Sequence, residues 1–436
     1  MMIRDIIFSY LQEILLTIFL IVNIFYMLAQ RKRFYNLFVV FSYLALLAAD
    51  YFVKADGFLI LLDASTFLML YIFYINQDKK DFSVSNFFIF AHLLSLHLIL
   101  KTDNLIIFFI SLEILSFVFY ILIGLESKKI RDFSPIIRYF VIGSITSLIM
   151  LFSLILIYSE TQSLKYTSLS LFNRNDVVFR LSIILFIFSL GFKILFIPFQ
   201  FFMPDIFEKV GIPYLTLISL TPKAGILIFL YKIKYYLPEI IFPLPLFAIV
   251  TIFISNLAGI YDNKVKRVLA YSSISHSGFL LFSVLLPEPY SRKVLLYYLL
   301  NYFIMKGGFF LSLNYLFKDQ KDLEFEKIRG LYFTDKVLAI SGLFYILSLF
   351  SFPPTGGFFA KFYLFYELYR AGFILEVFIL LLLTVLSFGY YIKFLNSFFL
   401  EPAVLRERKY SKFYEYYTLL LSIVSLCGAV FIKFFL

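Results

Sequence analysis

Four charged residues lie inside long apolar runs, where their side chains could transfer protons. Lys193 and Lys223 occupy successive hydrophobic segments, Glu113 lies near the middle of another, and Lys361 closely follows the run Pro-Pro-Thr-Gly-Gly. A lysine at the centre of a membrane helix costs roughly 2.5–3.5 kcal/mol on insertion scales. A buried amine can change protonation when a carboxylate partner moves or water reaches it, which is what a proton relay needs. The alternatives are a protonated glutamate that locks two helices, and lysines that extend to the membrane interface.

Two further residues are candidates for the same relay. His276 lies among small hydroxylated residues, and an imidazole with a pKa of about 6.5 suits proton transfer. A hydrogen-bonded histidine that only joins two helices fits its surroundings equally well. Lys306 precedes two glycines that would allow close packing beside it. His92 and His97 are weaker candidates.

Other charged residues are assigned to the membrane interface, because they lie nearer the predicted helix ends or have fewer features that support a role in the relay. They are Glu13, Asp50, Asp63, Glu367, Glu376 and Lys393.

The composition predicts an all-α polytopic membrane protein. Of 436 residues, 62% are hydrophobic and 15% charged, against about 25% charged residues in soluble domains. The net charge of +11 is dispersed over short loops, which indicates membrane topology rather than nucleic-acid binding. A single cysteine, Cys427, allows no cysteine cluster, and the sequence has no Walker loop, dinucleotide fingerprint or HExxH motif. We expect no cofactor or metal bound by this chain.

The hydrophobic segments predict fourteen membrane spans. They fall near 6–29, 35–53, 57–76, 84–101, 104–124, 135–159, 178–202, 212–236, 240–260, 266–286, 292–317, 336–370, 372–399 and 413–435.

Two of these spans are predicted to be broken helices. The seventh is interrupted near Pro198, and the twelfth at Pro353-Pro354. Each is the fourth helix of a five-helix group, which predicts two inverted repeats, spans 4–8 and 9–13. The predicted divisions are 1–83 (helices 1–3), 84–236 (first repeat), 240–400 (second repeat) and 401–436 (helix 14). Loops after odd-numbered spans hold more Lys and Arg, so we expect those loops in the cytoplasm and both termini on the opposite side.

Three stretches resemble the antiporter-like membrane subunits of respiratory complex I. They are FKILFIPFQFFMPDIFEKVGIPYLTLISLTPKAG, NLAGIYDNKVKRVLAYSSISHSGFLL and LFSFPPTGGFFAKFYLF, within a resemblance spanning roughly residues 55 to 400. The third stretch contains the pattern P-x-T-x-G-F-x-x-K-F, in which the lysine is Lys361. This form of the pattern is most similar to that of subunit N of NADH-quinone oxidoreductase. Lys306 is outside that pattern, and its surroundings also suit a hydrogenase or a multisubunit cation/proton antiporter.

The resemblance implies a non-redox, proton-translocating subunit without a catalytic centre of its own. It implies that Glu113, Lys193, Lys223, His276 and Lys361 form the relay. NADH, FMN, iron–sulfur clusters and quinone would be bound elsewhere in the complex. The implied partners are other membrane subunits, further antiporter-like subunits among them, and the lipid bilayer of a bacterial or archaeal inner or plasma membrane. Two other functions stay open: sodium/proton exchange driven by ion gradients, and an assembly scaffold that does not pump.

Overall fold

The computed structural model describes most of the second to fourth fifths of the chain and shorter parts near both ends. The described residues are 11–29, 57–58, 63, 82–125, 133–171, 176–197, 199–317, 323–400 and 412–426. The predicted second span and nearly all of the third lie outside these residues, as does Asp50.

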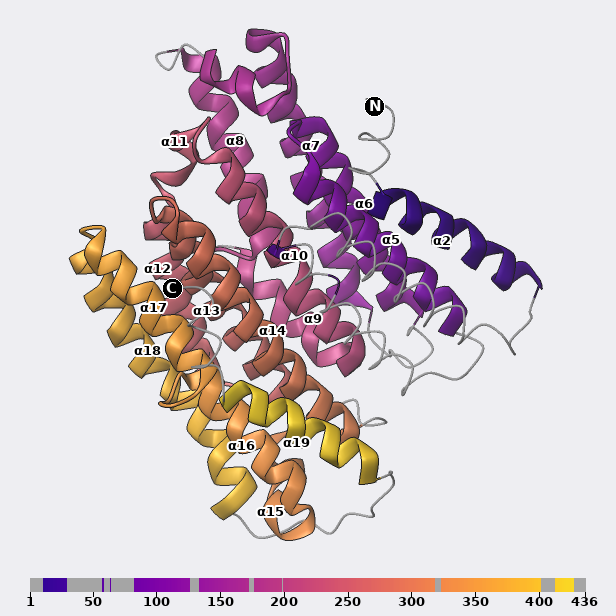
Figure 1. The fold of residues 1–436 in the computed structure, drawn as a ribbon, viewed down its shortest axis with the longest axis vertical. Helices are drawn as coiled ribbons and strands as arrows, with labels where there is room; N and C mark the ends of the chain where they lie inside the picture. The colour runs from indigo at the N-terminus through magenta and orange to yellow at the C-terminus, as the bar shows by residue number, and fades with distance from the viewer. Residues whose placement is uncertain are drawn as a thin grey trace. The chain divides into compact units, whose positions relative to one another are not determined.

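The chain forms two compact units, and the first comprises residues 1–131 and 150–182. Its helix α2 packs against α5, and α5 packs against α6 (Figure 1). The unit also holds the later part of α7, a short 3-10 helix η2 and the beginning of α8. The bounds are α2 Leu11–Ala29, α5 Phe82–Lys101, α6 Leu105–Leu125, α7 Ser134–Thr161, η2 Tyr166–Leu171 and α8 Val177–Ile194.

The second unit comprises residues 132–149 and 183–436, and α13 lies at its centre. Helices α9, α10, α12, α14, α17 and α18 all contact α13. The bounds are η3 Phe199–Phe201, α9 Phe202–Lys209, α10 Ile212–Ile233, α11 Pro238–Ile241, α12 Leu244–Tyr261, α13 Val265–Leu285, α14 Tyr290–Phe317, η4 Phe325–Ile328, α15 Leu331–Thr334, α16 Lys336–Phe350, α17 Gly356–Arg370, α18 Ile374–Leu395, the π-helical turn η5 Asn396–Leu400 and α19 Lys412–Leu426.

The described residues contain nine helices that are long and apolar enough to cross a membrane. These segments match the predicted spans from the fourth onward, except that the twelfth is divided into two shorter helices and the fourteenth is described only in part. The prediction of an all-α polytopic protein is therefore confirmed. The ninth span begins at Leu244 rather than at residue 240, because Pro238–Ile241 forms a separate short helix.

The first predicted interruption is present after α8. The helix ends at Ile194, and Leu195 adopts a left-handed conformation with φ of 68°. The chain then turns and resumes as η3 and α9. One amide in the turn, that of Ile197, donates to Thr251 Oγ1 at 3.1 Å. A backbone group freed by the break is thus satisfied by a neighbouring helix, as burial in hydrocarbon requires.

The second predicted interruption separates α16 from α17. Ser351 closes α16 in a left-handed conformation, with φ of 71°. Thr355 caps α17 by accepting a hydrogen bond from the Phe358 amide at 3.4 Å. The Gly357 amide donates to Ser348 Oγ at 3.1 Å, so the second half of the helix is joined directly to the first.

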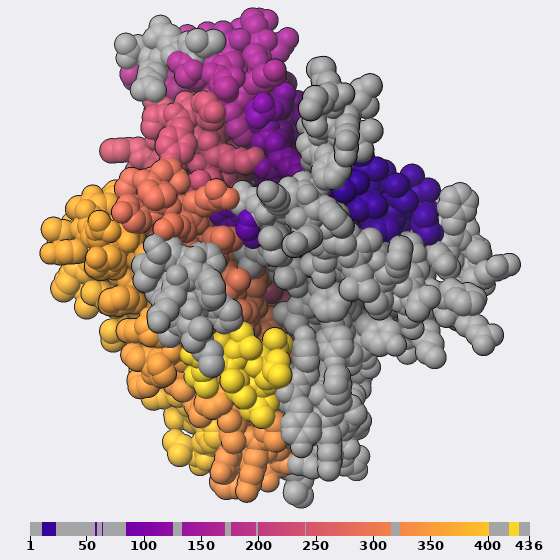
Figure 2. Space-filling model, viewed as in Figure 1, coloured from indigo at the N-terminus to yellow at the C-terminus, as the bar shows by residue number. Residues whose placement is uncertain are grey.

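Burial differs sharply among the helices of the second unit. In α13, 94% of the most apolar stretch is buried, against 28% in the segment that contains α18. Exposed large side chains follow one another along α18, among them Leu375, Phe378 and Val385. The part of the chain that contains α17 and α18, orange in Figure 2, lies at the surface seen in that view. A membrane protein is expected to place apolar helices such as α18 on the outside and to bury helices with polar residues such as α13.

Two isolated antiparallel bridges recur in similar surroundings. Asn104, just before α6, pairs with Lys165, and Lys264, just before α13, pairs with Glu324. Each bridge is extended by a second backbone bond, from Leu105 to Leu164 and from Val265 to Leu323. A 3-10 helix follows in both cases, η2 in the first unit and η4 in the second.

The close approach at the second interruption predicts that Gly357 cannot carry a side chain. A Cβ there would lie 1.8 Å from the backbone oxygen of Ser348. Gly357→Ala should therefore force α17 away from α16 and destabilise the protein by about 1–3 kcal/mol, the usual cost of overpacking. Thermal unfolding of the purified chain in detergent measures this.

Gly124→Ala is the matched control, because a Cβ at Gly124 would meet nothing within 4 Å. We expect its melting temperature to equal or exceed that of the wild type. Equal melting temperatures for Gly357→Ala and the wild type would contradict the assignment.

Candidate functional site

One face of α13 supplies the polar centre of the site. Ser272 and Ser273 follow Leu269 by three and four residues and precede His276 by four and three, so the four lie on one side of the helix. All four are at least 98% buried. The face offers hydroxyl groups, an imidazole and two backbone carbonyls to the neighbouring helices.

Lys223 reaches this face from α10. Its Nζ donates to Ser273 Oγ at 2.7 Å and to the Ser273 backbone carbonyl. Its side chain follows Pro222 within the helix and is 2% exposed. The ring of Tyr302 lies 5.7 Å from Nζ, which adds a cation–π contact.

Lys306 reaches the same face from α14, and it is fully buried. Its Nζ donates to the carbonyl of Leu269 at 2.9 Å and to Ser272 Oγ at 3.1 Å. Close packing beside it, as predicted from the glycines, is present: a Cβ at Gly308 would lie 2.4 Å from the ring of Tyr345.

Tyrosine hydroxyls connect these lysine sites to His276. Tyr391 OH lies 2.7 Å from Ser272 Oγ and 3.5 Å from His276 Nε2. On the other side of the imidazole, Tyr298 OH lies 3.1 Å from Nδ1. A line of exchangeable groups therefore runs from Lys306 through Ser272 and Tyr391 to His276.

A second branch leads from Lys223 toward the same imidazole. Ser273 Oγ, which accepts from Lys223, lies 2.9 Å from Tyr302 OH. The rings of Tyr302 and His276 are 5.2 Å apart. Hydroxyl groups that both donate and accept are suited to passing protons along such branches.

Lys361 lies on α17 and contacts α13 close to His276. It is 3% exposed, and its Nζ lies 4.1 Å from the centre of the Phe279 ring, three residues beyond His276 on α13. Within the described part of the chain it forms no hydrogen bond or ion pair. Among the described residues, no carboxylate pairs with Lys223 or Lys306.

The predicted pair Glu113 and Lys193 lies in different units. Glu113 is half-buried on α6 of the first unit, and Lys193 is half-buried in the last turn of α8, beside the first interruption, in the second. Their approach to one another stays a prediction.

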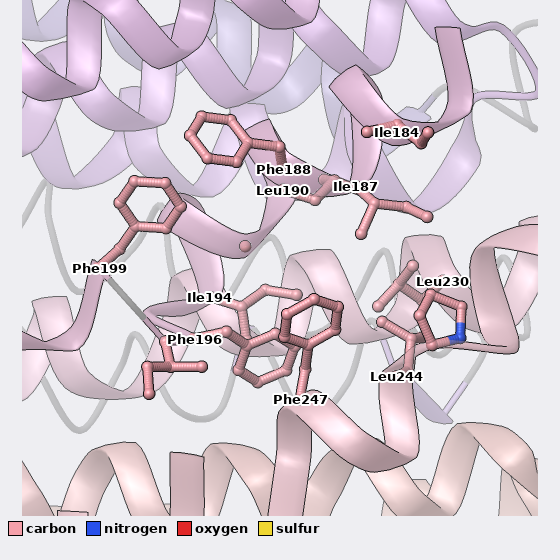
Figure 3. Close-up of a pocket in the computed structure, with 13 residues that line it drawn as sticks. Ile184, Ile187, Phe188, Leu190, Ile194, Phe196, Phe199, Leu230, Leu244 and Phe247 are labelled. Carbon is pink, nitrogen blue, oxygen red and sulfur yellow. The ribbon is translucent and has the colours of Figure 1, made fainter. Parts of the chain in front are cut away.

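An apolar cavity of about 280 Å³ lies beside that interruption (Figure 3). Side chains of α8, α10 and α12 line it together with the turn, including Phe188, Phe199 and Phe247. Its lining offers few groups that exchange protons, so the cavity is not part of the polar line around His276.

A network of ion pairs holds α9, the second half of the first broken helix, to α13. Arg267 donates to Asp205 and lies 3.3 Å from a carboxylate oxygen of Glu208, both on α9. Its Nε donates to Asp262 at 2.6 Å. Lys264 Nζ donates to Glu208 at 2.6 Å. The helix that carries His276 is thereby fixed to the interruption next to Lys193.

Sequence reasoning missed the hydroxyl groups that connect the lysines. Tyr298, Tyr302 and Tyr391 are three of 33 tyrosines, and nothing in their spacing marks them. Glu13 and Asp63, which are expected at the membrane interface, are 7% and 0% exposed, and both face His97 inside the first unit. Glu367 is also buried, at 4% exposed.

Comparison with known families decides what kind of membrane protein this is. Residues 102–387 match the model of the family described as NADH:quinone oxidoreductase/Mrp antiporter, transmembrane. Subunit N 1 of the NADH-quinone oxidoreductase of Thermodesulfovibrio yellowstonii is 31% identical over 351 residues, which cover 78% of this chain and 75% of that protein. The chain belongs to this family. The resemblance inferred from the sequence is thus confirmed.

Solved structures share the antiporter-like fold over nearly the whole chain. A chain of respiratory complex I from Thermus thermophilus aligns with a TM-score of 0.84 at 22% identity, covering 97% of both chains. A chain of the Mrp complex from Dietzia sp. aligns with a TM-score of 0.83 at 17% identity, covering 98% of this chain and 96% of that one. At these identities the structures establish the fold alone.

The ion-pair network predicts that Arg267 stabilises this antiporter-like fold. Arg267→Gln removes hydrogen bonds to charged groups on two segments, each worth about 1.5–3 kcal/mol. We expect a lower melting temperature for the purified subunit and faster proteolysis near residues 195–211. The control is Arg180→Gln, because Arg180 is exposed and has no ion pair among the described residues. Substitutions at such surface positions usually change stability by no more than about 0.5 kcal/mol. If both variants melt alike, the network does not hold α9 in place.

Proposed function

We propose that the chain is a subunit N-type component of NADH-quinone oxidoreductase that translocates protons without redox centres of its own. The observation that supports this most strongly is the buried line Lys306–Ser272–Tyr391–His276, with Lys223 joined through Ser273 and Tyr302. Buried ionisable groups in spans are expensive and usually serve transport. Here hydroxyl groups connect Lys306 to His276, and they connect Lys223 to Tyr302, whose ring lies beside His276.

In the proposed mechanism, quinone reduction elsewhere in the complex shifts the pair Glu113–Lys193. The altered field changes the proton affinity of Lys223, and a proton moves through the hydroxyl line and His276 toward Lys361. Moving one charge against 100 mV requires about 2.3 kcal/mol. That energy corresponds to a pKa change of about 1.7. Rearrangement of one buried ion pair could supply it.

We further propose that residues 84–236 and 240–400 are inverted repeats of five helices, with residues 1–83 and 401–436 at their ends. The recurring bridges support this. The first residue of each bridge, Asn104 or Lys264, directly precedes the second helix of its proposed repeat. The partners are Lys165 and Glu324. The two interrupted helices also fall at equivalent places. In this arrangement the broken helix that carries Lys361 corresponds to the one that carries Lys193, although Lys193 precedes its break and Lys361 follows its own. We propose that Lys193 serves proton uptake from the cytoplasm and Lys361 release on the other side.

The proposed partners are the other membrane subunits of the complex, including further antiporter-like subunits, in a bacterial or archaeal plasma membrane. NADH, FMN, iron–sulfur clusters and quinone would be held by those partners. Among the described residues no group of three His, Cys, Asp or Glu side chains could hold a metal ion.

A sodium/proton antiporter is the second candidate function. It is favoured by the similarity of the fold to a chain of the Mrp complex, and by Lys306, which the subunit N pattern does not include. The two candidates differ in driving force. An exchanger acidifies or alkalinises vesicles when only a sodium gradient is applied, whereas a complex I subunit pumps only during quinone reduction.

Lys361 gives the sharpest test of the proposal. Lys361→Ala removes the proton-carrying group, and Lys361→Arg keeps a charge that cannot be released at any relevant pH. We expect both variants to assemble and both to lower the number of protons pumped per electron, with Arg no better than Ala. Proton pumping by the intact complex in sealed vesicles measures this.

Lys336→Ala is the matched control, because Lys336 is exposed and begins α16, on the other side of the same interruption. It should pump as the wild type does. A Lys361→Ala complex that assembles and keeps the wild-type ratio would show that Lys361 is structural and would refute the release assignment.

A further inference from the structure

A second group of ionisable side chains is buried in the first unit, and it shares no residue with the α13 site of the second unit. His97 on α5 lies between two carboxylates: Nε2 is 2.9 Å from Asp63 Oδ1, and Nδ1 is 3.6 Å from Glu13 Oε1. Glu13 comes from α2, which packs against α5. The other oxygen of Glu13 accepts from Lys101 Nζ at 2.8 Å. Three separate parts of the chain thus contribute to one cluster.

The geometry around His97 favours one bound proton. A neutral imidazole has one N–H group, whereas both ring nitrogens here face carboxylate oxygens. With a neutral imidazole, the four groups Glu13, Asp63, His97 and Lys101 carry a net charge of −1. One added proton makes the set neutral, which lowers the cost of burying it. The proton could lie on His97 or on either carboxylate.

The burial of the cluster decreases from Asp63 to Lys101. The side chains of His97 and Asp63 are 0% and 1% exposed, Glu13 is 10% exposed, and Lys101 is 21% exposed. Lys101 is the last residue of α5, where the helix ends. The two oxygens of Glu13 join the lysine to the imidazole, so a carboxylate connects the more exposed end with the buried end.

Other ionisable groups near the cluster do not contact His97. His92, about one and a half turns earlier on α5, is fully buried, and neither of its ring nitrogens has a hydrogen-bond partner among the described residues. Helix α6 packs on α5 and carries Glu113 and Tyr120, but the only hydrogen-bond or ion-pair partners of His97 among the described residues are Asp63 and Glu13. A sodium ion fits the cluster poorly, because imidazole is a weak ligand for hard cations and Lys101 already occupies Glu13.

We propose that Glu13, Asp63 and His97 form a second proton-binding site of this chain, which exchanges its proton with water through Lys101. The Lys101 ammonium would donate its proton to Glu13 and then take a replacement from water, or water would protonate Glu13 directly, and the proton would pass on to His97 and Asp63. Each step moves one proton between adjacent groups and leaves the total charge of the donor and acceptor unchanged. The site does not depend on the α13 line or on the proposed pumping function, since it is defined by proton binding alone.

Histidine-selective nitrogen NMR of the full chain in liposomes tests proton binding. The chain has three histidines, so each can be assigned by a single substitution, with His97→Gln identifying His97. If the proton lies on His97, we expect two protonated ring nitrogens at neutral pH. If it lies on a carboxylate, we expect a carboxylic-acid band in the infrared spectrum that disappears in Glu13→Gln or Asp63→Asn. His92 should show a neutral ring, and His92→Gln should leave both signals unchanged.

A neutral His97 together with fully ionised carboxylates in the wild type would overturn the proposal, and this result does not depend on any variant folding. Loss of the His97 proton on adding sodium at constant pH would also overturn it, in favour of a cation site.

Isotope exchange tests the route to water. After transfer to D₂O, the His97 ring proton should exchange about tenfold more slowly in Lys101→Met than in the wild type, equivalent to roughly 1.4 kcal/mol. Lys165→Met is the control, because Lys165 is an exposed lysine of the same unit. Equal exchange in Lys101→Met and the wild type would refute access through Lys101. Since no pumping is measured, failure here leaves the proposed function intact.

Discussion

The second unit depends on how ammonium groups are accommodated where water is scarce. Lys223 and Lys306 each donate to one serine hydroxyl and one backbone carbonyl of α13. A carbonyl has two lone pairs, so it can accept from a lysine while it also accepts the helical amide four residues on. Because an unsatisfied buried polar group costs several kcal/mol, α13 must present these acceptors at fixed positions. The surrounding helices α9, α10, α12, α14, α17 and α18 therefore pack around a polar helix rather than an apolar one.

The interrupted helices follow from the same requirement. A continuous helix uses its own carbonyls and amides, and so it offers no free backbone group at depth. At α8 the chain stops one residue after Lys193, and at α17 it resumes five residues before Lys361. Each turn is held by a hydroxyl from outside the broken segment or from its other half: Thr251 in the first case and Ser348 in the second. The breaks are thus ordered structures with defined partners, placed beside the two lysines.

The sequence was informative wherever one residue type is rare in its surroundings. Lysines are rare in apolar runs and prolines are rare inside helices. The burial of Lys223, Lys306 and Lys361 and the positions of both interruptions could therefore be predicted. Tyr391 could not, because a tyrosine in a chain this rich in aromatics packs equally well with or without a hydrogen bond. The contact between Glu13 and Lys101 joins residues 88 positions apart, and no periodicity within one helix contains that information. Residues that act through helix pairing therefore escaped prediction, while residues that conflict with their own helix did not.

Lys361 differs from the other two lysines in a way that bears on direction. Lys223 and Lys306 each have two oxygen acceptors, whereas the only described contact of the Lys361 ammonium is the ring of Phe279 at 4.1 Å. A desolvated cation–π contact is worth about 2 kcal/mol, less than two hydrogen bonds to an ammonium. An aromatic ring also remains neutral and fully packed after the amine loses its proton, whereas a buried carboxylate would be left with an unpaired charge. Loss of the proton from Lys361 would therefore leave no buried acceptor without its donor and no buried charge without its partner. This property of its partner fits the proposed release from Lys361, beside the second interruption.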